Sequence, residues 1–117
     1  MDTHIDEAKA KEYYVFLKAT FGGISFKGLT LLAEMLTVYK QGEHLKHALA
    51  IVAKAHGLKA DTVKIDLATY VRYINTQFTN ADISNMFGYA PKTDETSIKP
   101  AEFVLLLRDY LDTLEAV

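Results

Sequence analysis

The chain has 117 residues, of which 50% are hydrophobic, and it contains neither cysteine nor tryptophan. This length supports one compact core, and the lack of cysteine excludes disulfides, Cys-ligated metal sites and thiol catalysis. Fifteen acidic and 13 basic residues give a net charge of −2, which provides no overall basic field for nucleic acid. No apolar run reaches the roughly 20 residues of a membrane span, and the acidic N-terminus is unlike a signal peptide. We therefore expect a cytoplasmic protein without membrane contact.

Two prolines and six glycines divide a chain that is otherwise rich in helix-forming residues. Between these breakers, apolar residues recur every three or four positions, the spacing that lines one face of a helix. Ser25 and Asn80 are expected helix N-caps, Gly57 an expected helix end and Pro100 an expected helix start. The expected helices cover residues 6–20, 26–40, 43–56, 61–77, 81–87 and 100–115. The sequence thus predicts an all-α, compact six-helix single domain over residues 1–117, with one long loop at 89–99.

Residues 43–77 form a candidate helix-turn-helix, because two helices flank a short turn that contains Gly57. The stretch 40–79 holds six Lys and Arg against three Asp and Glu, a local net charge of +3. His44, His47 and His56 lie in the same stretch and add positive charge below neutral pH. Such a basic hairpin can meet a DNA phosphate backbone, and it can equally be an ordinary solvated helix pair.

Several short motifs follow one another in a familiar order over residues 8–115. They are Phe26-Lys27-Gly28, Met35-Leu36-Thr37-Val38-Tyr39, Asn85-Met86-Phe87-Gly88-Tyr89 and Lys99-Pro100-Ala101-Glu102-Phe103. In this order the sequence resembles the C-terminal DNA-binding (effector) domain of the sporulation stage-zero response regulator A family. The resemblance implies a six-helix transcription-factor domain whose fourth helix enters the major groove of duplex DNA. The family domain normally follows a phosphorylatable receiver domain, and we expect no receiver domain in this chain.

The fourth helix departs from the family where DNA would be read. Its expected core positions leave an outward face on which Thr62, Ile65 and Ala68 stand where the family carries arginine. Because guanine is read by Arg or Lys, this change weakens base recognition and leaves Lys64 and Arg72 to contact phosphate or base edges. Lys59 is expected on phosphate, and the remaining residues on base edges or methyl groups. The predicted DNA-binding residues are Lys59, Thr62, Lys64, Ile65, Thr69 and Arg72.

Two functions remain open at this point. The first is a helix-turn-helix transcriptional regulator that binds duplex DNA, as a homodimer on two half-sites in the manner of such modules. The alternative is a degenerate interaction module of the same fold, which does not read DNA and binds another protein through Ile65, Ala68 and Thr69.

The sequence gives no pattern that favours an enzyme. His44 and His47 share a helical face, but two imidazoles are too few to specify a metal site. Asp109 and Asp112 lack a positioned partner for acid–base chemistry. A glycine-rich phosphate loop, a GxSxG motif and an HExxH motif are all missing from the sequence. We therefore expect no catalytic residues, no metal site and no cofactor.

Overall fold

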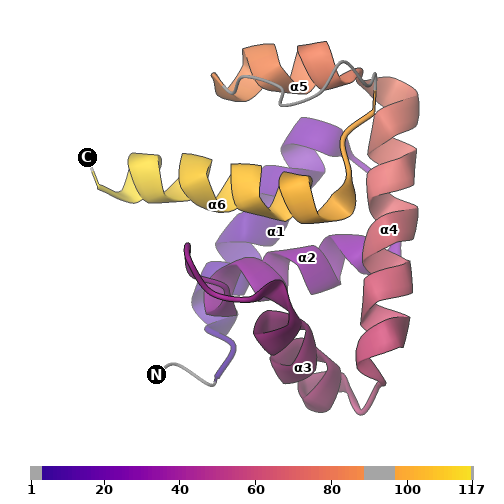
Figure 1. Cartoon of the computed structure of the whole chain (residues 1–117), viewed down its shortest axis with the longest axis vertical. Helices are drawn as coiled ribbons and strands as arrows, with labels where there is room; N and C mark the ends of the chain where they lie inside the picture. The colour runs from indigo at the N-terminus through magenta and orange to yellow at the C-terminus, as the bar shows by residue number, and fades with distance from the viewer. Residues whose placement is uncertain (1–3, 89–96, 117) are drawn as a thin grey trace.

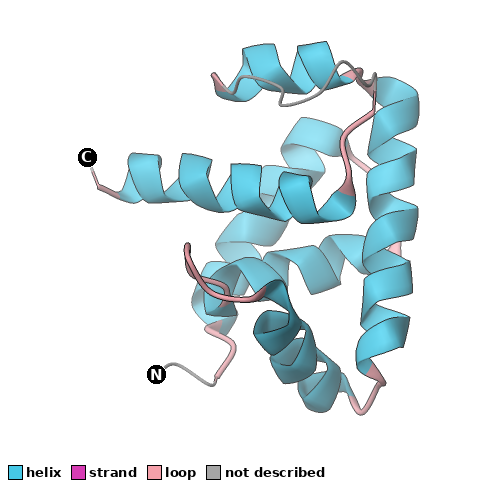
Figure 2. Cartoon of the chain, viewed as in Figure 1, coloured by secondary structure: helices cyan, strands magenta, loops and turns pink. Residues whose placement is uncertain are grey.

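The computed structural model describes residues 4–88 and 97–116. Over these residues the chain folds into α-helices without a strand, around one hydrophobic core (Figures 1 and 2). The helices are α1 (Glu7–Phe21), α2 (Lys27–Val38), α3 (Leu45–His56), α4 (Ala60–Gln77), α5 (Asn80–Phe87) and α6 (Pro100–Glu115). The predicted all-α fold of six helices in a single domain is confirmed over these described residues.

Helix α2 is the centre of the fold. It packs against α1, α3, α4 and α6, and its side chains at Leu29, Leu32, Met35 and Leu36 are fully buried. In Figure 1, α4 runs along one edge of the molecule, α3 lies beside the N-terminal half of α4, and α5 lies near its C-terminal end. This arrangement buries one side of α4 against α2 and leaves the other side facing outward.

A close approach of α2 to α4 fixes the position of α4. A Cβ atom added at Gly28 would lie 2.3 Å from the Asp66 carbonyl oxygen and 2.6 Å from Tyr70 Cβ. Both distances are shorter than carbon atoms tolerate, so only glycine lets the first turn of α2 rest on the backbone of α4.

Two of the expected N-caps are wrong. Phe26, not Ser25, is the N-cap of α2, and its side chain makes no capping hydrogen bond. Thr79, not Asn80, caps α5: its hydroxyl accepts from the Asp82 amide at 3.1 Å, and the Asp82 carboxylate accepts from the Thr79 amide at 2.9 Å. This reciprocal box satisfies two free amides at once, whereas Asn80 lies one position later and is buried.

Other helix ends agree more closely with the sequence. Gly57 ends α3 in the left-handed conformation, with φ 64° and ψ 32°, and Pro100 occupies the first turn of α6, as predicted. Helix α3 begins at Leu45, two positions later than expected, because His44 still has an extended backbone. Of the predicted loop at 89–99, positions 89–96 lie outside the described residues.

Candidate nucleic-acid interface

The turn between α3 and α4 is short and well defined. Residues 57–59 connect the two helices, and the Gly57 amide donates to the carbonyls of Ala53 and Lys54. The Leu58 amide donates to the Ala53 carbonyl at 2.8 Å, and Lys59 is the extended N-cap of α4. The turn therefore joins two packed helices within residues 43–77, and their use as a DNA-binding helix-turn-helix stays a prediction.

Helix α4 has a buried inner face and an exposed outer face. Five apolar or aromatic side chains at the expected core positions are buried, namely Val63, Leu67, Tyr70, Val71 and Ile74. On the outer side, Lys64 and Arg72 are exposed, and Ile65 exposes 63% of its surface. No other helix is drawn outside this edge of α4 in Figure 1. The outer face of α4 is therefore open to a partner.

The structure brings most of the predicted residues to the start of this face. Lys59 and Thr62 are exposed at the first turn of α4, next to Lys64 and Ile65. Arg72 lies farther along, about 15 Å from Thr62 at 1.5 Å rise per residue. Thr69 and Ala68 are half-buried.

The charged groups of the outer face are free to meet a ligand. Lys59, Lys64 and Arg72 form no ion pair with any residue that the structure describes. The Thr69 hydroxyl donates to the Ile65 carbonyl at 2.9 Å, so it offers a partner its methyl group and a lone pair rather than a proton. Asp61, exposed in the first turn, opposes the positive charge locally.

Aromatic side chains behind this face hold α4 against the turn between α1 and α2. The sequence alone did not predict this contact. The Tyr70 hydroxyl donates to the Gly22 carbonyl at 2.9 Å, and burial raises the pKa of Tyr70, which keeps this donor protonated. Tyr73 packs on Phe26 with ring centroids 4.8 Å apart. A Cβ atom at Gly23 would lie 2.7 Å from the Tyr70 ring, so this glycine also makes room for the rings.

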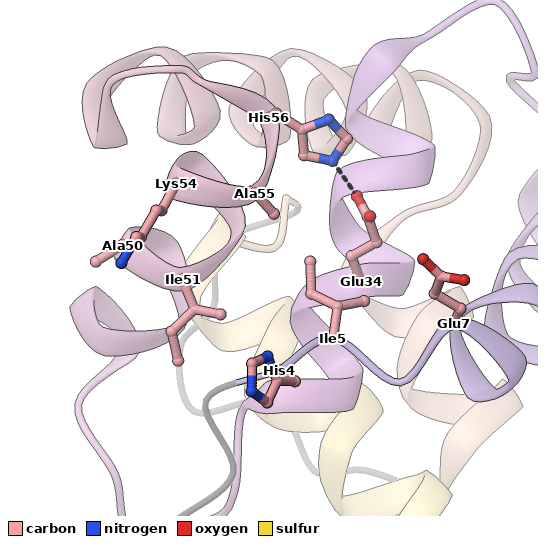
Figure 3. Close-up of a pocket in the computed structure, with 9 residues that line it drawn as sticks. All are labelled: His4, Ile5, Glu7, Glu34, Ala50, Ile51, Lys54, Ala55 and His56. Atoms are coloured by element: carbon pink, nitrogen blue, oxygen red, sulfur yellow. Dashed lines mark hydrogen bonds and ion pairs between the residues drawn. The ribbon is translucent and has the colours of Figure 1, made fainter.

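A second surface feature is an open hollow of about 860 Å³, lined by the N-terminal segment, α1, α2 and α3 (Figure 3). Ile5 and Ile51 contribute apolar surface to it. Glu34 and His56 meet in its wall, with His56 Nε2 and Glu34 Oε1 2.5 Å apart. In the described parts of the chain, no group of three or more His, Asp or Glu is arranged to hold a metal ion.

Comparisons of the chain with protein-family models, with curated proteins and with solved structures find no match in any of the three. The resemblance to the sporulation regulator's effector domain thus stays a prediction from its motifs. Within 4–88 and 97–116, none of the helices has the length and apolar character needed to cross a bilayer.

Proposed function

We propose that this chain is a cytoplasmic helix-turn-helix transcriptional regulator that binds duplex DNA through the outer face of α4. The observation that carries the proposal is the set of exposed cations Lys59, Lys64 and Arg72, which have no ion-pair partner among the described residues. Lys64 and Arg72 lie on α4 and Lys59 is its N-cap, and this helix forms one edge of the molecule (Figure 1). Exposed cations of this kind gain most by neutralising phosphate, because binding releases the counterions of DNA.

The shape of this edge suits a major groove. Helix α4 has 18 residues and is about 27 Å long, and a groove about 12 Å wide accepts one helix. In helix-turn-helix proteins the N-terminal residues of the second helix contact base edges, while the first helix crosses the backbone. The corresponding residues here are Thr62 and Ile65, which suit a thymine methyl, and Lys64, which reaches a phosphate or a base edge.

The side chains at the start of the outer face determine how well the protein distinguishes one base from another. None of Thr62, Ile65 and Ala68 can make the bidentate contact that distinguishes guanine or adenine, worth roughly 1–3 kcal/mol for each base. We therefore expect phosphate contacts to supply most of the affinity, with limited discrimination between sequences.

The first test replaces single cations of the α4 face. Lys64→Ala and Arg72→Ala should each weaken binding to a duplex of random sequence and lower the slope of log affinity against log salt by about 1. Fluorescence anisotropy with a labelled duplex measures both quantities. Lys18→Ala is the matched control, because Lys18 is also exposed but lies on α1. Unchanged affinity in both α4 variants would show that DNA does not contact this face.

A second candidate function is favoured by the exposure of Ile65. Ile65 leaves 63% of its surface in water beside half-buried Ala68 and Thr69, and together they offer apolar surface to a protein partner. Under this alternative, the face binds another protein, or a second copy of the chain, and does not read DNA.

Ile65→Asp separates DNA binding from pairing of two copies of the chain. If the face pairs two copies of the chain, the variant sediments as a monomer at concentrations where the intact chain is a dimer. If the face binds DNA, the added carboxylate weakens duplex affinity and leaves the sedimenting mass unchanged. An intact chain that binds DNA and is monomeric in free solution would exclude self-association through Ile65.

A further inference from the structure

The contact between His56 and Glu34 joins the end of α3 to α2 in the wall of the hollow (Figure 3). His56 is the last residue of α3, so the turn at 57–59 begins directly after it. The Glu34 side chain is 17% exposed and the His56 side chain 36%, so the carboxylate is the more buried partner of a contact at the surface. The contact therefore holds the chain at the point where it leaves α3 for α4.

We propose that Glu34 and His56 are positioning residues for the α4 interface, and that protonation of His56 controls how firmly they hold the α3–α4 turn. The part of the proposal that concerns DNA rests on the proposed function. The part that concerns the turn does not, since it follows from a contact within the folded chain.

Protonation changes the strength of this contact. A neutral imidazole gives Glu34 one ordinary hydrogen bond, whereas an imidazolium gives a charge-assisted bond that is roughly twice as strong. Histidine commonly changes charge between about pH 5 and pH 8, within the range of cellular conditions. An imidazolium at His56 also lies at the C-terminal end of α3, where the helix dipole favours a positive charge.

Charged groups around the hollow also act on a protonated His56. The carboxylates of Glu34 on α2 and Glu7 on α1 attract a protonated His56, while Lys54 on α3 and His4 on the N-terminal segment repel it (Figure 3). Of these groups, Glu34 makes the hydrogen bond to the ring. The pair is therefore tightest at acidic pH, and it loosens as the imidazole loses its proton.

A looser contact between Glu34 and His56 should lower the affinity for DNA, because Lys59 and the first turn of α4 are then held less firmly. These groups follow His56 by a few residues, and the turn between contains Gly57, whose backbone is intrinsically permissive. A held turn presents the α4 face already ordered, so less conformational entropy is lost on binding.

The first experiment needs no DNA. Thermal midpoints are measured at about pH 6 and pH 8, either side of the usual histidine range, for the intact chain, Glu34→Gln, His56→Gln and the double variant. Each single variant should lower the midpoint by about 3 °C at the acidic pH and by much less at the alkaline one. The double variant should lose no more than either single variant. Equal losses at both pH values would overturn the role of protonation.

Two further variants make this result specific. His56→Lys keeps a cation beside Glu34 at both pH values, so its midpoint should lose the pH dependence attributed to the pair. His47→Gln is the matched control, because His47 is exposed on the same helix and contacts no carboxylate among the described residues. A pH response that persists in His56→Lys, or disappears in His47→Gln, would contradict the assignment to His56.

The second experiment measures affinity for a random duplex at the same two pH values and at constant salt. The intact chain should lose about threefold more affinity than His56→Gln as the pH rises, since both share the other histidines. If the thermal midpoints change with pH as expected but neither the intact chain nor any variant binds DNA, the proposed function fails and the role of the Glu34–His56 contact in the fold is supported. If DNA binds but the two proteins lose affinity equally, the positioning role is refuted.

Discussion

Arg108 shows how a single buried charge ties three helices together. This residue on α6 is 6% exposed, and its side chain donates to the Leu36 carbonyl on α2 and to Asp112 at 2.9 Å. Its guanidinium also lies 5.6 Å from the centre of the Tyr13 ring on α1. A buried charge is costly unless it is fully partnered, so removing one partner should cost more than the contact itself contributes.

Glu115 extends this network and makes it sensitive to acid. The Tyr13 hydroxyl donates to the Glu115 carboxylate at 2.5 Å, and this bond, with the nearby charges of Lys9 and Arg108, lowers the pKa of Glu115. A carboxyl with a lowered folded-state pKa stabilises the fold above its unfolded value of about 4.3, and this contribution is lost as the pH falls through the folded value.

The first prediction at this scale compares Glu115→Gln with the intact chain. Their difference in free energy of unfolding should be constant above about pH 5 and should shrink as the pH falls below about 4. Urea denaturation across this pH range measures it. Glu43→Gln, an exposed carboxylate without an ion-pair partner in the described chain, is the control. A Glu115→Gln difference that persists unchanged to about pH 3 would refute the network's role.

Single residues also mark where the sequence was hardest to read. Arg108 reads as a surface residue, and its partner carbonyl at Leu36 lies 72 positions earlier in the chain. The partners Glu34 and His56 are 22 positions apart. Such pairs have no periodicity and no motif, so only the packed helices reveal them. The cap at Thr79 was missed for a local reason, since Thr79 and Asn80 are both good capping residues.

At the scale of elements, the contact of α2 with α4 determines where the candidate interface lies. Gly28 lets the two backbones touch at Asp66, and Tyr70 covers the same contact from α4. Near the C-terminal end of α4, the Asn75 side chain donates to the Ile98 carbonyl at 2.9 Å and accepts from the Ile98 amide at 3.1 Å. Helix α4 is thus held at its middle and near its C-terminal end, and its outer face remains free.

Gly28→Ala tests this support. Alanine favours a helix over glycine by about 1 kcal/mol, but the added methyl has no space against the α4 backbone, and overpacking costs about 1–3 kcal/mol. We expect a net loss of stability and a weaker duplex affinity, because α4 has to move away from α2. Thr30→Ala, on the exposed side of α2, is the control. A more stable Gly28→Ala protein would show that α4 moves to make room for the methyl group without a loss in the free energy of unfolding.

The helices themselves were largely predictable, because burial of one face imposes the 3.6-residue period on the sequence. That period placed Val63, Leu67 and Tyr70 inside and Ile65 and Arg72 outside, as the structure has them. Helix starts were less predictable, since they depend on which of several neighbouring polar groups forms the cap. The candidate face followed from the same period, whereas its supports at Gly28 and Tyr70 did not, because they join elements far apart in sequence.

At the scale of the whole molecule, charge is the property that most directly concerns DNA. The net charge is −2, yet residues 40–79 carry +3 and the rest of the chain −5. A protein of this kind should not attract DNA at long range over its whole surface. It should bind only where α3, the turn and α4 face the duplex, and the binding should depend steeply on salt.

The salt dependence of duplex binding by the intact chain tests this account most directly. With Lys59, Lys64 and Arg72 on phosphate, log affinity should fall with log salt at a slope of about −2.7, so affinity should drop about 40-fold between about 50 mM and 200 mM salt. No binding at about 50 mM, or an affinity that does not change with salt, would contradict the claim that the outer face of α4 binds duplex DNA.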